Sequence, residues 1–108
     1  MYVARWQFTT RFGRRDECLK VLRKWYVDVA QRVGWRSLRV LSGSIGGPES
    51  QIELEVQIDN VDDLEAAWRD MAAVPYHAEY QKQLAEVIVD GTERWTIHRV
   101  ADMTPAES

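Results

Sequence analysis

The chain has 108 residues, of which 45% are hydrophobic and 29% are charged, the size and composition of one globular domain with one core. Its formal net charge of −3 gives no electrostatic reason to expect a nucleic acid partner. No apolar run approaches the length that spans a membrane, so a membrane partner is not expected either.

The only cysteine is Cys18, which therefore has no partner in the chain for a disulfide. It lies within a helical pattern where a small buried apolar residue fits, so we interpret it as part of the core. A free cysteine, together with an N-terminus that shows no signal or transit peptide, predicts a cytoplasmic protein.

The first half of the chain predicts two strands with a helix between them. Residues 2–10 alternate between two faces, which is typical of a strand. Residues 14–33 carry apolar side chains at three- and four-residue steps, the pattern of one amphipathic helix. Gly34 is expected to end this helix, because glycine readily takes the left-handed conformation found after helices. Residues 36–42 form a shorter apolar run that we interpret as the second strand.

The clearest strand pattern covers residues 51–59, where apolar and polar side chains alternate strictly. Its apolar side requires a core, and its polar side must meet water, a partner or a ligand. Residues 43–50 have turn-forming composition and are expected to join this strand to the preceding one as a hairpin. A phosphate-binding loop is disfavoured there, because a strand rather than a helix follows.

The second half predicts a helical segment followed by a last strand. Asn60 precedes acidic residues and is expected to cap a helix. Pro75 interrupts this helix, which gives either two short helices or one kinked helix. Residues 94–100 alternate again and form the last strand. One domain is therefore expected over residues 1–101, with a polar tail over residues 102–108.

The order strand, helix, strand, strand, helix, strand predicts an α+β, ferredoxin-like βαββαβ fold. In that topology a four-stranded antiparallel sheet carries both helices on one face. The first and third strands are central, and the opposite face of the sheet stays bare. Val3 and Leu41 would also lie on the bare face, which favours self-association through it.

This order of elements, with residues 49–56, 63–68 and 76–80, resembles the dimeric α/β-barrel superfamily. Within it the chain is similar to NIPSNAP-type and antibiotic-biosynthesis-monooxygenase-type domains. The resemblance implies a homodimer in which two sheets face each other around a cavity. It also implies binding of a small aromatic or apolar ligand, and a monooxygenase-like activity that needs no cofactor. The element order covers nearly the whole chain, but such motifs are shared by unrelated activities.

The polar side of the bare sheet face is the first candidate site. Its members, including the residues that flank the two central strands, are Arg5, Gln7, Arg39, Glu53, Glu55, Gln57 and His98. In a dimeric cavity the carboxylates and the imidazole would exchange protons with a ligand. The alternative is a non-catalytic assembly module, in which the same side chains form cross-strand salt bridges and register one subunit against another.

A second candidate site combines Trp68, His77 and Tyr80. Heme-degrading members of the monooxygenase-like group use an Asn on the first strand with a Trp and a His on the second helix. Gln7, Trp68 and His77 resemble a shifted version of that trio, so heme is the alternative cofactor. The competing interpretation places Trp68 in the core and His77 in a surface or cleft position. Tyr80 takes the His position if Tyr76 is matched to the helix instead.

The motifs of the common cofactor sites are missing from the sequence. There is no Cys or His cluster at metal spacing, no glycine-rich dinucleotide fingerprint and no elbow around a nucleophilic serine. We therefore expect no metal and no cofactor.

Overall fold

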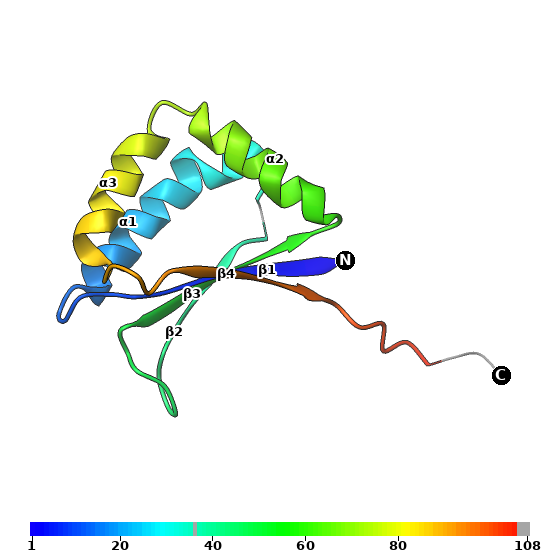
Figure 1. Cartoon of the computed structure of the whole chain (residues 1–108), viewed down its shortest axis with the longest axis horizontal. Helices are drawn as coiled ribbons and strands as arrows, with labels where there is room; N and C mark the ends of the chain where they lie inside the picture. The colour runs from blue at the N-terminus through cyan, green and yellow to red at the C-terminus, as the bar shows by residue number, and fades with distance from the viewer. Residues whose placement is uncertain (36, 106–108) are drawn as a thin grey trace.

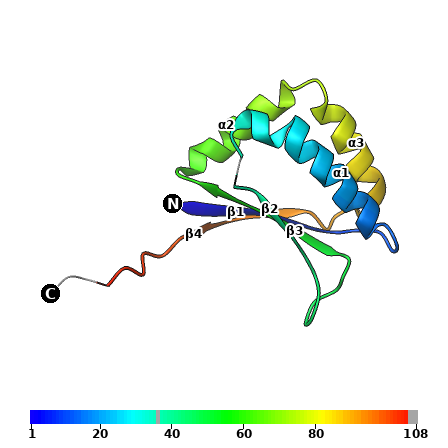
Figure 2. The ribbon, with the colours of Figure 1, turned by 180° about the vertical axis from the view of Figure 1, so that it is seen from behind.

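The computed structural model describes residues 1–35 and 37–105. Four strands form one antiparallel sheet in the order β2-β3-β1-β4, namely β1 (Tyr2–Thr9), β2 (Arg39–Ser42), β3 (Gln51–Ile58) and β4 (Arg94–Arg99). The helices are α1 (Arg15–Asp28), α2 (Val61–Ala72) and α3 (His77–Val87), with a short 3-10 helix η1 (Ala30–Val33) after α1. All of them lie on one side of the sheet (Figures 1 and 2). The predicted α+β, ferredoxin-like class is confirmed.

The register of the central strands explains the alternation seen in the sequence. Along β1, Trp6 lies opposite Leu54 of β3 and Trp95 of β4, all on the side that the helices cover. Arg5 lies opposite Glu55 on the other side, which no described helix covers. The pleat therefore separates an apolar face from a polar face, as the strict alternation of β3 requires.

The core is a single cluster between the sheet and the helices. Phe8 and Ile52 are opposite each other in the sheet and are almost completely buried, as is Leu84 of α3. Each such side chain stabilises the fold by about 1.5–3 kcal/mol. Cys18 of α1 is buried in the same cluster, and burial raises the pKa of its thiol to about 12. The interpretation of Cys18 as a core residue is confirmed.

The prediction of one helix over residues 14–33 is wrong after Asp28. The α-helix ends at Asp28, and Val29 leaves helical geometry with φ −124° and ψ −62° before the tighter turns of η1 begin. Val29 and Ala30 are both fully buried, so the apolar periodicity continues through a change of helix type. Gly34 then adopts a left-handed φ of 90°, as expected.

The second helical segment consists of two helices, the first of the two alternatives. The backbone N–H of Asn60 donates a 3.1 Å hydrogen bond to the Asp63 carboxylate at the start of α2. The connection between α2 and α3 contains Pro75. Strand β2 is shorter than predicted because pairing with β3 begins only at Arg39, and residue 36 lies outside the described residues. No helix of the described chain is long and apolar enough to cross a membrane.

Candidate functional site

All five tryptophans of the chain line one cavity of about 220 Å³ between the helices and the sheet. Its lining consists of Trp6, Trp25, Trp35, Trp68, Met71, His77, Gln81, Glu93 and Trp95. The residues come from α1, α2, α3, β1 and β4, and from the segments that follow η1 and precede β4. Segments distant in the sequence therefore contribute to one aromatic chamber.

The tryptophan rings hold one another in fixed orientations. Trp6 and Trp95 are stacked across the β1–β4 pair, with ring centroids 6.0 Å apart and planes 9° apart. Trp68 and Trp35 are inclined to Trp95 by 67° and 60°, at centroid distances of 5.3 and 6.2 Å. Edge-to-face and offset contacts of this kind are the preferred arrangements of aromatic rings. Trp25 is only 3% exposed whereas Trp68 is 41% exposed, so the chamber meets solvent at Trp68.

His77 is a titratable group in direct contact with this aromatic wall. Its Nδ1 accepts a 3.3 Å hydrogen bond from Nε1–H of Trp25. The indole N–H can only donate, so Nδ1 must be unprotonated and the neutral ring carries its proton on Nε2. Burial lowers the pKa of His77, which favours this neutral form. His77 therefore offers an Nε2–H donor rather than a positive charge.

A continuous polar ladder crosses the bare face of the sheet. Glu55 is 11% exposed and lies between two guanidinium groups, with Oε2 3.0 Å from Nη2 of Arg39 and Oε1 3.8 Å from Nη2 of Arg5. Arg5 Nη1 is also 3.3 Å from Oε1 of Glu53. Both carboxylates therefore have cationic partners on neighbouring strands.

Gln7 extends the ladder to β4. Its Nε2 donates to Glu53 at 3.1 Å, and its Oε1 accepts a 3.0 Å hydrogen bond from Nε of Arg94. The chain of contacts thus runs from the edge strand β2 to the edge strand β4. Of the two interpretations of this face, a proton-exchanging site or a set of cross-strand salt bridges, the arrangement corresponds to the salt bridges.

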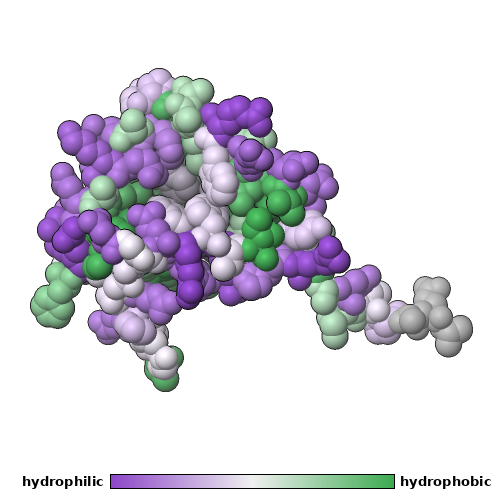
Figure 3. Space-filling view, in the orientation of Figure 1, coloured by the Kyte–Doolittle hydropathy of each residue, from purple (hydrophilic) through white to green (hydrophobic). Residues whose placement is uncertain are grey.

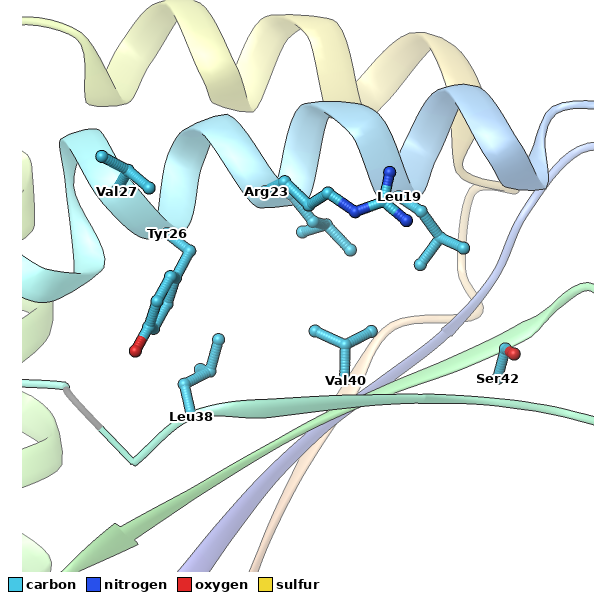
Figure 4. A pocket seen from close by; sticks show the side chains of 8 residues that line it. Leu19, Arg23, Tyr26, Val27, Leu38, Val40 and Ser42 are labelled. Carbon is cyan, nitrogen blue, oxygen red and sulfur yellow. The ribbon is translucent and has the colours of Figure 1, made fainter.

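A larger hollow of about 480 Å³ lies between α1 and β2 (Figure 4). In the figure, side chains of α1 face those of β2 and the residue before it; the labelled ones are Leu19, Arg23, Tyr26, Val27, Leu38, Val40 and Ser42. Its described lining contains no acid and no histidine, so it supplies no group for proton transfer near neutral pH. We therefore place the candidate site in the tryptophan-lined cavity, although it is the smaller of the two.

The surface of the molecule is mixed in polarity on the face that Figure 3 shows. On the face in Figure 3, hydrophobic atoms form small patches separated by hydrophilic side chains.

Among the described residues, no group of three or more His, Cys, Asp and Glu side chains is placed to hold a metal ion.

Comparison with known proteins finds matches only among solved structures; no family model and no curated protein matches the chain. A NIPSNAP family protein from Agrobacterium tumefaciens superimposes with a TM-score of 0.81 at 20% identity, over 98% of each chain. A NIPSNAP-like domain protein from Burkholderia xenovorans does so with 0.79 at 18% identity, over 97% of this chain and 89% of the other. This chain shares the fold of these NIPSNAP proteins.

The NIPSNAP fold is also shared by an enzyme. SnoaB, a cofactor-independent oxygenase from Streptomyces nogalater, matches with a TM-score of 0.66 at 17% identity over 97% of each chain. The resemblance stated from the sequence, to NIPSNAP-type and monooxygenase-type domains, is confirmed at the level of fold. At these identities the likeness concerns the fold alone.

Within this NIPSNAP fold, the residues of the first predicted site stay together on the bare face. Arg5, Gln7, Arg39, Glu53 and Glu55 form the ladder described above. Gln57 and His98 lie on the same face, each opposite Val3 in the register of the sheet. They are exposed, and the ladder contacts do not include them.

Two of the three residues of the second predicted site stay together, and the third does not. Trp68 and His77 line the same cavity, so the interpretation of Trp68 as a core residue is wrong and the cleft position of His77 is where the structure has it. Tyr80 points elsewhere and donates a hydrogen bond to the Asp28 carboxylate, which raises the pKa of Tyr80. Gln7 lies on the opposite face of the sheet, so the trio that suggested heme does not line one site.

Sequence reasoning missed most of the cavity. Trp6, Trp25, Gln81 and Glu93 line it but are not among the site residues that the sequence predicts. The available signal was the number of tryptophans, which is unusual for a chain of this length. Composition does not show that the rings gather on one side of the sheet, because Trp35 and Trp95 are far apart in the chain.

Proposed function

We propose that this protein binds a small aromatic or apolar molecule in the tryptophan-lined cavity, and that it does so as a homodimer. The observation that carries the proposal is the convergence of all five tryptophans around a hollow that also contains His77. The volume of about 220 Å³ is below the roughly 300–1,000 Å³ of pockets for drug-sized ligands, which favours a ligand of few atoms.

The cavity supplies both affinity and orientation in this proposal. Aromatic contacts stabilise a bound ring by about 0.5–1.5 kcal/mol beyond the area they bury. Nε2–H of His77 and the Gln81 amide supply the few polar groups that would orient a hydroxyl or carbonyl. The stacked pair of Trp6 and Trp95 keeps the wall rigid, which lowers the entropy lost on binding.

Titration with phenol tests this function. In ¹⁵N-labelled protein we expect phenol to shift the indole N–H resonances of the cavity tryptophans. Replacing Trp68 by Ala should weaken binding about fivefold or more, since the exposed wall of the cavity is lost. Phe12→Ala removes a fully exposed aromatic ring outside the cavity and should leave phenol affinity unchanged. Phenol that shifts no indole resonance at millimolar concentration would overturn the proposal.

The homodimer is proposed to form through the bare sheet face. Val3 and Leu41 add apolar surface to the ladder on this face. Nε of Arg5 and Oγ1 of Thr96, opposite each other in the sheet, are buried without a hydrogen-bond partner among the described residues. Buried polar atoms are nearly always paired, so two unpaired ones on this face favour side chains that rearrange when the face meets a partner.

We also propose a cofactor-independent, monooxygenase-like reaction in the cavity. SnoaB, which shares the fold, is a cofactor-independent oxygenase. An N–H donor such as His77 Nε2, held in this aromatic chamber, would donate a hydrogen bond to the oxygen of a bound phenol and hold its ring in place.

Oxygen uptake with 1,4-dihydroxynaphthalene tests the reaction. We expect uptake above the protein-free rate and incorporation of ¹⁸O into the product, with both reduced at least tenfold in His77→Asn. Protein that binds phenol but gives no uptake above the protein-free rate would restrict the function to binding.

A further inference from the structure

The charge that lines the tryptophan-lined cavity is of one sign only, negative. Its polar groups are the Glu93 carboxylate, the Gln81 amide and His77, whose Nδ1 accepts the hydrogen bond from Trp25 only in the neutral ring. No lysine or arginine is among the described residues that line it. A ligand inside therefore meets one negative charge and no positive charge.

The Glu93 carboxylate is available for a ligand. It directly precedes β4 and lines the cavity, although it is also exposed to solvent. The other carboxylates near β1, those of Glu53 and Glu55, are bound to arginines on the opposite face. No described side chain forms a hydrogen bond or ion pair with Glu93.

The rings add to the negative potential. The face of a tryptophan is the negative end of its quadrupole, and it attracts cations more strongly than the ring of any other side chain. Trp35 and Trp68 are both steeply inclined to Trp95, so three walls of the chamber are aromatic rings. Such a chamber with a nearby carboxylate suits quaternary ammonium groups, which have no N–H to pair and expose methyl groups to the rings.

We infer that the preferred ligand of this cavity is a small organic cation that carries a trimethylammonium or similar alkylammonium group. The inference rests on the proposed function, since it concerns the same cavity, and it narrows the apolar ligand to one whose apolar methyl groups surround a charged nitrogen. It also excludes carboxylates and phosphates as ligands, because Glu93 and the ring faces repel them.

Comparing choline with its neutral isostere 3,3-dimethyl-1-butanol tests whether the cavity recognises the charge of a ligand or only its shape. The two molecules differ by a carbon in place of the ammonium nitrogen. Titrations followed by the indole N–H resonances at constant ionic strength should show choline binding at least about tenfold more tightly than the alcohol. Equal binding, weaker binding of choline, or no choline binding would overturn the inference.

Two glutamate variants test the carboxylate. Glu93→Gln should weaken choline binding about threefold or more and leave the affinity for the alcohol unchanged. Glu65→Gln removes the same charge from an exposed position on α2 outside the cavity and should change neither affinity. Equal losses of choline affinity in both variants, or no loss in Glu93→Gln, would contradict the assignment of Glu93.

The phenol titration distinguishes a failure of the cation inference from a failure of the proposed function. If phenol binds while choline does not exceed the alcohol, the cavity is a ligand site but its ligand is not a cation. If phenol, choline and the alcohol all fail to shift the indole resonances, both proposals are wrong.

Discussion

His77 shows how one residue links burial to chemistry. Its Nδ1 is bound by Trp25, and burial lowers its pKa from the ordinary value of 6.5. Protonation would place a second N–H against the indole N–H and break the hydrogen bond. The contact between α1 and the first residue of α3 therefore depends on a neutral imidazole.

This dependence predicts a loss of stability in acid. The unfolded chain takes up the proton near pH 6.5, whereas the native chain resists it to lower pH. The free energy of unfolding therefore falls as pH drops below about 6.5 and is unaffected by this group above that value. In urea unfolding at pH 7.5 and pH 5, His77→Asn should show a smaller decrease than the unmodified protein, because asparagine keeps an acceptor without titrating.

The second histidine provides the control for this comparison. His98 is exposed on β4, on the face of the sheet opposite the cavity. His98→Asn should keep the pH dependence of the unmodified protein. If His98→Asn removes it and His77→Asn does not, the acid sensitivity belongs to the bare face rather than to the cavity.

The β2–β3 hairpin illustrates constraint at the scale of an element. Its loop packs Gly43 against the following backbone, so that a Cβ on Gly43 would lie 1.7 Å from the carbonyl oxygen of Pro48. A Cβ on Gly47 of the same loop would have ordinary contacts, the nearest atom being 4.0 Å away. Gly43 is therefore required because no side chain fits at its position, whereas Gly47 is not under this steric constraint. Both appear simply as turn residues in the sequence.

Replacing each glycine by alanine should therefore reduce stability by different amounts. Gly43→Ala should destabilise the protein by about 1–3 kcal/mol, because the loop must move to admit the methyl group. Gly47→Ala should cost less than about 1 kcal/mol. Chemical denaturation of both variants measures the difference, and equal losses would mean that the loop yields without cost.

For the whole molecule, the open question is what covers the bare sheet face. Leu41 lies opposite Glu53 on this face and is 39% exposed. In a homodimer with two-fold symmetry, one substitution there enters the interface twice.

Leu41→Glu should therefore weaken self-association. In sedimentation at micromolar concentration we expect a dimer for the unmodified chain and a tenfold or greater increase in the dissociation constant for this variant, from burial of two added charges. Val61→Glu places the same change at the exposed start of α2, on the helical side of the molecule, and should leave the dimer intact. A monomer for the unmodified chain would remove the proposed dimer.

The sequence by itself determined the fold class, the order of elements and the two faces of the sheet. Strict alternation in residues 51–59 and the helical spacing that follows are local signals, because a strand or helix directs side chains with a fixed period. The same local rules placed Gly34 and the break near Pro75. They failed at Val29, where buried side chains continue through a change from α-helix to 3-10 helix.

Only the tertiary structure decided which side chains meet. Trp25, Trp68 and Trp95 lie on three different elements, and no period along the chain relates one to another. The hydrogen bond from Trp25 to His77 joins residues 52 positions apart. The salt bridges of the bare face likewise depend on which strands are neighbours in the sheet. Local periodicity states which side of an element is covered, whereas packing alone decides what covers it and whether the covered space holds a cavity.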